Sequence, residues 1–292
     1  MKPVAFEYHS PHSLDEALAT LARVAPLEGR VIAGGQSLVP AMAFRLVRPG
    51  HLVDINAIAG LDHLRVEADE LVIGACVRHA SFHRPVVAGV LGRALTDIAA
   101  HVAHYPIRMR GTFCGSLAQA DPASEWCLLA LTLGARMIVR SVRGERSIPA
   151  HAFFQGVMST DIQPDELLTE VRIPLPEAQA RIGFDEFSRR RGDFALAMAL
   201  VQFDLLDGRM QAVRVGVGAV EATARRIEAA EQTLEGGMPT MDRFQAAARA
   251  AGQAVDPSDQ PQLPAVYRRE LVESCVRRAL ERALSATLPK LP

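Results

Sequence analysis

The chain has almost no lysine: among 292 residues it has 32 lysines and arginines, and only Lys2 and Lys290 are lysines. Any positive charge that a binding site needs must therefore come from arginine or histidine. The formal net charge is −1, so the sequence also lacks the basic excess that is typical of nucleic-acid-binding proteins. We expect no nucleic acid among the partners.

No apolar run approaches the roughly 20 residues that a membrane-spanning helix requires. The first residues, Met1 to Phe6, are not followed by the apolar segment of a secretory signal peptide. We therefore expect a cytoplasmic protein with no membrane span. Hydrophobic residues make up 49% and charged residues 22%, which is typical of a globular protein with a sizeable core. This length suggests one large domain or two medium ones.

Cysteine is scarce, and its spacing does not indicate a metal site. Cys76, Cys114, Cys127 and Cys275 are far apart and include no C-x-x-C pair. This argues against zinc or an iron–sulfur cluster on this chain, and disulfides are rare in the cytoplasm. We expect free thiols that act as small hydrophobic side chains. Cys114 is the exception of interest, because it lies inside a glycine-containing loop.

Known catalytic signatures are also missing: there is no P-loop, no H-E-x-x-H and no G-x-S-x-G motif. Gly216-Val217-Gly218 precedes a predicted helix, but Glu221 stands where a dinucleotide-binding motif needs its third glycine. We interpret that run as structural. His101 and His104 lie on one helix-like segment without a carboxylate nearby, which is weak evidence for a metal pair.

What the sequence does have is two loops of glycine and small residues. The first, Ala33 to Leu38, follows a short apolar run that predicts a buried strand. The second, Arg110 to Pro122, ends in Asp121-Pro122, which predicts a helix start with aspartate as the cap. Such loops expose backbone N–H groups that bind phosphate. Two of them in one domain suggest an elongated ligand with a diphosphate.

The remaining pattern predicts an α+β fold in two parts. Ser13 to Glu16 is a capping box that begins a helix. The first part has predicted strands at 3–10, 30–33, 51–55, 64–66, 71–74, 135–139, 146–149 and 167–173, and helices at 77–83, 86–103 and 122–133. Residues 174–182 indicate a linker. Asp207-Gly208 then predicts a hairpin, followed by helices at 222–234, 240–254 and 266–286.

Together these motifs resemble those of the FAD-binding medium subunits of the molybdenum hydroxylases, which include carbon monoxide dehydrogenase and the xanthine dehydrogenase FAD domain. The matching runs follow the order of the family over nearly the whole chain. They are Ala33 to Met42 with Arg45, Leu46 and Pro49, then Ile107 to Glu125, Arg189 to Ala195, and Gly216 to Gly218. Because several separated motifs match in order, the resemblance is specific.

The resemblance implies a two-lobed FAD-binding domain of the vanillyl-alcohol-oxidase (PCMH) type at residues 1–176. A smaller α+β C-terminal domain would follow at 177–292. The implied cofactor is FAD, with backbone from both glycine loops around its diphosphate and an acidic residue near its adenosine. The cofactor-binding residues implied in this way are Ile32, Ala33, Gly34, Gly35, Gln36, Ser37, Leu38, Gly111, Thr112, Phe113, Cys114, Gly115, Ser116, Asp121, Glu125, Leu168 and Phe194.

Three of these residues have more specific implied roles. Glu125 falls on the acidic position near the adenosine, Leu168 where an apolar residue lies close to the flavin, and Phe194 where an aromatic ring can cover the isoalloxazine. The chain departs from the family at Cys114, which replaces the first glycine of a Gly-Gly pair. A side chain there would lie beside the ligand.

The resemblance also implies partners. A large molybdopterin-binding subunit would oxidise the organic substrate, and a small subunit would carry two [2Fe–2S] clusters, in a dimer of heterotrimers. This chain would pass electrons from those clusters through FAD to an external acceptor, with no catalytic residue and no metal of its own. Two alternatives stay open. One is a stand-alone FAD-dependent oxidoreductase, whose base would come from His101, His104 and Tyr105, and the other is a scaffold that has lost FAD.

Overall fold

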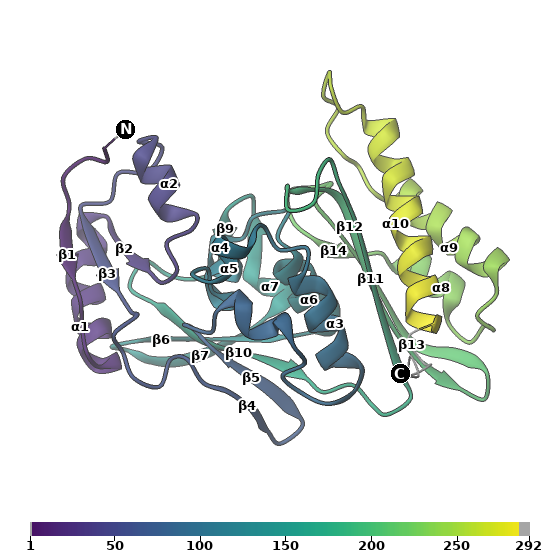
Figure 1. The fold of residues 1–292 in the computed structure, drawn as a ribbon, viewed down its shortest axis with the longest axis horizontal. Helices are drawn as coiled ribbons and strands as arrows, with labels where there is room; N and C mark the ends of the chain where they lie inside the picture. Colours follow the sequence, from purple (N-terminus) through teal and green to yellow (C-terminus); the bar gives the residue numbers. More distant parts are fainter. Residues whose placement is uncertain (1, 286–292) are drawn as a thin grey trace.

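The protein is an elongated α+β molecule, seen in a computed structural model that describes residues 2–285. Figure 1 shows three sheets of three or more strands arranged along the long axis, each with helices packed against it. No helix among residues 2–285 is long and apolar enough to cross a membrane. The sheets divide the chain into a first lobe, a second lobe and a C-terminal part.

The first lobe is a small parallel sheet with one covering helix. Its strands lie in the order β1-β3-β2. Ser13 caps α1 by accepting a hydrogen bond from the Glu16 amide at 3.2 Å, as the capping box predicts. The elements are β1 (Glu7–His9), α1 (Leu14–Val24), the 3₁₀ turn η1 (Ala25–Leu27), β2 (Gly29–Ile32), α2 (Leu38–Ala43) and β3 (His51–Asp54).

The second lobe has a five-stranded antiparallel sheet in the order β4-β5-β10-β6-β7. In Figure 1, α3, α5 and α6 lie over this sheet. The elements are β4 (Leu64–Glu67), β5 (Glu70–Gly74), η2 (His79–His83), α3 (Gly89–Ala99), α4 (Tyr105–Arg108), α5 (Phe113–Gln119), α6 (Glu125–Leu133), β6 (Arg136–Ser141), β7 (Gly144–Pro149), α7 (Ala150–Phe153), β8 (Phe154–Gly156), β9 (Ser159–Thr160) and β10 (Leu167–Pro174).

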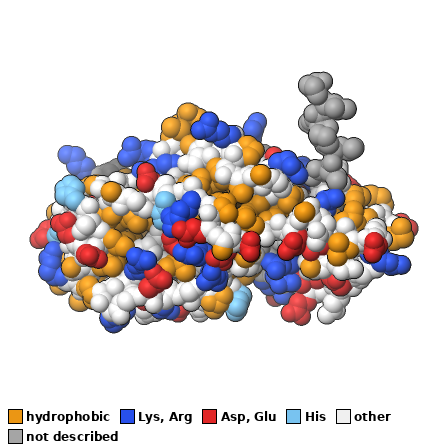
Figure 2. Space-filling model, turned by 90° about the horizontal axis from the view of Figure 1, so that it is seen from below, with side chains coloured by type: hydrophobic (Ala, Val, Ile, Leu, Met, Phe, Trp, Pro, Cys, Tyr) orange, Lys and Arg blue, Asp and Glu red, His pale blue; other side chains and the backbone are white. Residues whose placement is uncertain are grey.

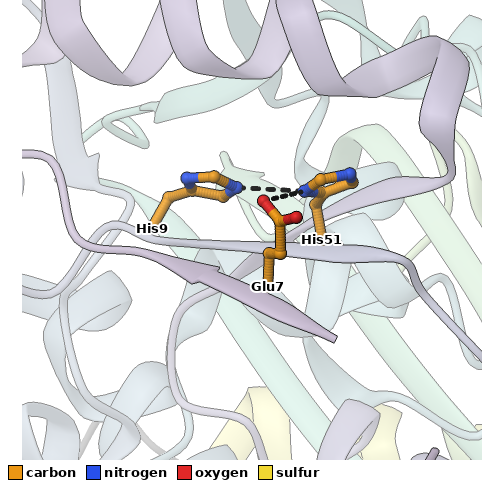
Figure 3. A group of neighbouring side chains, drawn as sticks. All are labelled: Glu7, His9 and His51. Carbon is orange, nitrogen blue, oxygen red and sulfur yellow. Dashed lines mark hydrogen bonds and ion pairs between the residues drawn. The ribbon is translucent and has the colours of Figure 1, made fainter. Parts of the chain in front are cut away.

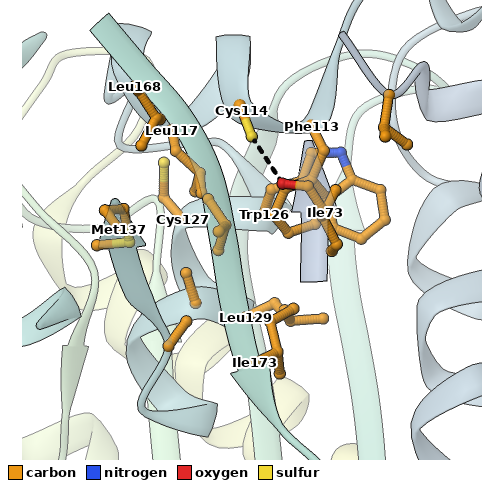
Figure 4. Packing of buried hydrophobic residues seen from close by; sticks show 14 of the residues in the cluster. Ile73, Phe113, Cys114, Leu117, Trp126, Cys127, Leu129, Met137, Leu168 and Ile173 are labelled. Carbon is orange, nitrogen blue, oxygen red and sulfur yellow. Dashed lines mark hydrogen bonds between the residues drawn. The ribbon is translucent and has the colours of Figure 1, made fainter. Parts of the chain in front are cut away.

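Aromatic packing forms the centre of the second lobe. Trp126 on α6 is fully buried, and its ring centroid lies 4.9 Å from that of Phe113 and 5.3 Å from that of Phe82. Figure 4 shows Phe113 and Trp126 side by side in this core. Trp126 is therefore a core residue of the second lobe. Phe113 is the first residue of α5, a helix that lies within the segment from Arg110 to Pro122.

The C-terminal part is a four-stranded antiparallel sheet, β11-β12-β13-β14, in which β12 is largely buried on both faces. Alternate residues of β12 point to opposite sides: Ala199 and Val201 pack toward α10, whereas Met198 and Leu200 join the core of the second lobe. The elements are β11 (Ala180–Ser188), β12 (Ala195–Leu206), β13 (Arg209–Gly218), β14 (Arg225–Arg226), α8 (Glu228–Leu234), α9 (Met241–Ala254) and α10 (Ala265–Ser285). The domain boundary at 176/177 stays a prediction.

Several predicted elements have different bounds in the structure. The segment expected as a loop forms α5, because the Thr112 hydroxyl caps it by accepting from the Gly115 amide at 3.0 Å. The prediction that Asp121 caps the next helix is wrong: α6 starts at Glu125 with Ser124 as its cap, and Asp121 accepts from the Ala123 amide within the preceding turn. The helices expected at 77–83, 86–103 and 222–234 are shorter in the structure, and β11 begins inside the expected linker. The last residue of the helix expected at 266–286 lies outside the described residues.

The surface carries both signs of charge. Figure 2 shows acidic and basic side chains interspersed over one face, with hydrophobic side chains between them. This distribution agrees with the near-neutral net charge of the chain. Charge of one sign therefore does not dominate this face.

Candidate cofactor-binding site

A cleft of about 560 Å³ is lined by residues from the first lobe and the second lobe. Most of the residues that the sequence implied for the cofactor come together here. They are Ile32, Ala33, Gly34, Gly35, Gln36, Ser37, Leu38, Gly111, Thr112, Cys114, Gly115, Ser116 and Leu168. The two glycine loops are thus walls of the same cleft.

The two loops touch backbone to backbone. A Cβ placed on Gly34 would lie 2.3 Å from the carbonyl oxygen of Arg110 and 2.6 Å from the Cα of Gly111. Both distances are too short for any side chain, so only glycine permits this approach. Gly35 is favoured for a different reason: its φ of +71° lies in the left-handed region, which residues with a side chain rarely adopt. The first loop is therefore shaped by its two glycines.

A side-chain bridge also joins the loops. The Asn56 amide donates to the Ala33 carbonyl at 2.7 Å, and the Arg78 guanidinium donates to Asn56 Oδ1 at 2.6 Å. Arg78 donates as well to the carbonyl oxygen of Arg110 on the second loop. The bridge holds one loop of each lobe against the other. Neither Asn56 nor Arg78 carries a sequence signal, since their role depends on three-dimensional contacts alone.

The first loop presents unpaired backbone donors. Among residues 2–285, no acceptor pairs with the amide N–H groups of Gly35, Gln36, Ser37 or Leu38. An amide N–H that has no acceptor costs free energy where water is excluded. Successive N–H groups of this kind form a concave site that can bind an anion. The cleft therefore fits the diphosphate of a dinucleotide at this wall.

The sequence suggested that the Cys114 side chain would lie beside the ligand. In the structure the residue borders the cleft, but its side chain is directed away from it. Its thiol points into the core and donates weakly to the carbonyl oxygens of Ile73 and Gly74, each at 3.5 Å (Figure 4). The residue is 2% exposed, and burial raises the pKa of the thiol well above its usual value. The departure from the family glycine is therefore accommodated by the core rather than by the cleft.

His79 is a cleft residue that the sequence reasoning missed. The Trp126 indole donates to His79 Nδ1 at 3.0 Å, so the neutral imidazole carries its proton on Nε2. Burial, assisted by the charges of Arg108 and Arg78, lowers the pKa of His79 to about 4. The ring therefore stays neutral at physiological pH and offers a single N–H donor. A lone histidine in an unremarkable sequence context gives no advance sign of this role.

A further part of the lining comes from the stretch between Met158 and Leu167, which had no sequence signal, and it continues into Leu168, which the resemblance had implied. Glu166 lies in this stretch, and both of its carboxylate oxygens accept from the Arg146 guanidinium at 2.8 Å. These bonds lower the pKa of the Glu166 carboxyl group, so it remains ionised and both of its oxygens are engaged by Arg146. Ser159 and Thr160 on β9 add hydroxyl groups to the same part of the lining.

Four of the implied residues lie outside the lining of the cleft. Phe113 is in the aromatic core, Asp121 is in the turn before α6, and Phe194 lies 73% exposed between β11 and β12. Glu125 is buried, and desolvation together with the nearby Glu186 carboxylate raises its pKa to about 8. Their contacts with a cofactor stay predictions.

His101, His104 and Tyr105, from which a stand-alone enzyme would take its base, do not lie together around one site. His101 lies 3.8 Å from Glu186 and edge-on to Phe184, whereas the Tyr105 ring stacks on His83. His104 instead lies next to Gly192, close enough that a Cβ there would meet its ring. None of the three lines the cleft. The helix-like segment predicted to carry His101 and His104 is interrupted, because α3 ends at Ala99.

Comparison with known proteins agrees with this arrangement. Residues 4–176 match the family described as the FAD binding domain in molybdopterin dehydrogenase, and residues 182–283 match the CO dehydrogenase flavoprotein C-terminal domain. The chain is 38% identical to the 6-hydroxypseudooxynicotine dehydrogenase complex subunit alpha of Paenarthrobacter nicotinovorans, over 99% of this chain and 98% of that one. It is 36% identical to the caffeine dehydrogenase subunit beta of Pseudomonas sp. (strain CBB1), over 97% and 96%.

Solved structures show the same similarity. Quinoline 2-oxidoreductase from Pseudomonas putida 86 contains a chain that is 37% identical, with a TM-score of 0.93, covering 99% of this chain and 100% of that one. This chain belongs to the family of FAD-binding medium subunits of molybdenum hydroxylase-type dehydrogenases. Its cofactor is FAD, and it is a subunit of an oxidoreductase. The family, the fold and the cofactor predicted from the sequence are confirmed.

Proposed function

We propose that this chain is the electron-transfer subunit of its complex, passing electrons from the [2Fe–2S] clusters of a small partner subunit through FAD to an external acceptor. A large molybdopterin-binding partner would oxidise the organic substrate. When bound, FAD supplies the redox chemistry, and the protein supplies binding, orientation and electrostatics. The relatives are subunits of multi-subunit dehydrogenases, which supports a similar assembly here.

The observation that carries the proposed binding site is the row of unpaired amides from Gly35 to Leu38 beside the contact between Gly34 and Arg110. We assign the diphosphate of FAD to this wall. Backbone N–H groups would neutralise the phosphate charge, so the near absence of lysine is no obstacle. The free hydroxyl groups of Ser37 and Ser116, which line the cleft, would add donors.

The chemistry of the cleft favours electron transfer over substrate turnover. Its titratable residues in the described part of the chain are Arg30, His79, Cys114 and Glu166. His79 is held neutral, Cys114 points into the core, and Glu166 is engaged by Arg146. A stand-alone oxidoreductase would need a proton acceptor near the flavin. The cleft is better suited to holding a cofactor than to acid–base catalysis.

An anaerobic mixing experiment tests the proposal. The FAD-loaded chain is mixed with a dithionite-reduced [2Fe–2S] partner subunit, freed of excess dithionite, and the flavin absorbance is followed. We expect rapid bleaching that reaches completion at two reduced clusters per FAD, because each [2Fe–2S] cluster gives one electron and full reduction of the flavin takes two. A chain that turns over an organic substrate without partners, or a flavin that stays oxidised in the complex, would contradict the proposal.

A further inference from the structure

Three metal-ligating side chains meet on the first lobe, away from the cleft (Figure 3). His9 Nε2 lies 3.1 Å from His51 Nδ1, and Glu7 Oε2 lies 3.4 Å from the same nitrogen. All three ligand atoms are within 4.8 Å of one another. The parallel register that pairs Glu7 with His51 puts these side chains on one face of β1 and β3, because side chains two apart on a strand share a face.

The distances match the edges of a small coordination tetrahedron. Zinc bonds to histidine nitrogen are about 2.0–2.1 Å long, so two ligands of tetrahedral zinc lie about 3.3–3.4 Å apart. The two contacts to His51 Nδ1, at 3.1 and 3.4 Å, bracket the length of this edge. A cation could therefore enter with small side-chain rotations and no movement of the strands.

The number of protons available for hydrogen bonds at His51 also favours a cation. The Nδ1 atom of His51 faces both a ring nitrogen of His9 and a carboxylate oxygen of Glu7, and it can donate at most one proton. The two imidazole rings are also stacked, with centroids 5.3 Å apart. A divalent cation at the centre would accept lone pairs from all three atoms at once. Two imidazoles and one carboxylate suit zinc-type ions, whereas Mg²⁺ and Ca²⁺ prefer all-oxygen sites.

We propose that Glu7, His9 and His51 bind one Zn²⁺-type divalent ion, with solvent completing its coordination. The ion would clamp β1 to β3. β1 has only three residues, and β3 pairs in turn with β2, the strand that leads into the first glycine loop. The site is accessible from solvent, because the Glu7 side chain is 72% exposed while that of His51 is 12% exposed.

This site is independent of the proposed cofactor function. None of its three residues lines the cleft, and no redox role is assigned to the ion. The sequence predicted no metal on this chain because it contains no C-x-x-C or H-E-x-x-H spacing. His9 and His51 are 42 residues apart, and only strand pairing brings them together.

The test is a calorimetric titration of the full-length, FAD-loaded chain after chelator treatment and removal of the chelator. We expect uptake of one Zn²⁺ per chain and no uptake of Mg²⁺. His9→Gln and Glu7→Gln should each weaken Zn²⁺ binding by at least about tenfold, since loss of a direct ligand should exceed the loss of an outer-shell partner. His151→Gln, a change to an exposed histidine on α7, is the matched control and should bind like the parent.

Hydrogen exchange provides a readout that does not depend on the flavin. The Glu7 amide donates to the Gly50 carbonyl at 2.9 Å, and Zn²⁺ should slow exchange of this amide in the parent but not in His9→Gln. Absence of Zn²⁺ uptake by the parent would overturn the proposal. Unchanged Zn²⁺ affinity in both His9→Gln and Glu7→Gln would overturn it equally, because the ion would then be bound elsewhere.

Discussion

Gly34 and Arg110 are in direct backbone contact: a Cβ on Gly34 would lie 2.3 Å from the Arg110 carbonyl oxygen. The contact joins the first lobe to the second at the wall of the cleft. It explains why two loops that are distant in sequence act as one binding surface. It also makes the shape of that surface sensitive to changes that do not touch the ligand itself.

The Asn56–Arg78 bridge should contribute measurably to FAD binding. Arg78→Ala removes the bonds to Asn56 and to the Arg110 carbonyl, so each loop loses part of its positioning. Hydrogen bonds to charged groups contribute about 1.5–3 kcal/mol each, less where solvent competes. We expect FAD affinity to fall roughly 10-fold in Arg78→Ala, measured by fluorescence quenching of added FAD.

Arg249→Ala is the matched control, because Arg249 is exposed on α9 in the C-terminal part. A double-mutant cycle with Asn56→Ala should show coupling, since the two side chains act through one bridge. Additive losses from the two substitutions would contradict a shared role.

Glu125 should make stability depend on pH. Its pKa is raised from 4.5 to about 8, chiefly by burial and secondly by Glu186. Between those values the folded protein keeps a proton that the unfolded chain releases, so stability falls as pH rises from about 4.5 to about 8 and levels off above. At 1.36 kcal/mol per pKa unit the change amounts to roughly 3–5 kcal/mol.

Glu125→Gln keeps the neutral form at every pH and should flatten this dependence, giving a chain more stable than the parent at pH 8. Urea denaturation of the FAD-free chain at pH 5.5 and pH 8 measures the effect. Glu145→Gln is the control, because the Glu145 side chain is 49% exposed on β7. If Glu125→Gln shows the same loss of stability with pH as the parent, the buried carboxyl is not responsible.

Cys114 should be dispensable for the cofactor. Its thiol bonds to the carbonyls of Ile73 and Gly74 in the core, so Cys114→Ala removes no group from the cleft. We expect FAD affinity within about twofold of the parent and a loss of stability of about 1 kcal/mol. Titration with FAD and urea denaturation separate the two effects. A Cys114→Ala chain that folds normally but no longer retains FAD would show that the thiol acts in the cleft.

The sequence located the first glycine loop of the cleft because close backbone approach and positive φ leave a trace in residue type. Gly34 and Gly35 are glycines for those reasons, and the loop could be recognised before the fold was known. The apolar pattern likewise predicted the two-part α+β fold. Local signals misled where helix caps were ambiguous: Ser124 rather than Asp121 caps α6, and Thr112 caps α5 in a segment that was expected to be a loop.

Other parts of the site could not be predicted. Asn56, Arg78 and His79 acquire their roles from partners on other elements, and none of them stands in a distinctive local pattern. The same is true of His9 and His51, which only the strand register brings together. Roles that depend on pairing across the fold leave no short-range trace in the chain.

Titration of FAD-free chain with FAD, comparing Gly34→Ala with Gly156→Ala, tests the central claim most directly. A Cβ on Gly34 meets the Arg110 carbonyl, whereas a Cβ on Gly156 meets nothing within 4 Å. Forcing the loops apart should cost about 1–3 kcal/mol, so Gly34→Ala should bind FAD at least about 10-fold more weakly while Gly156→Ala binds one FAD like the parent. If a folded Gly34→Ala chain binds FAD as tightly as the parent, the cleft between the two glycine loops is not where the cofactor is held.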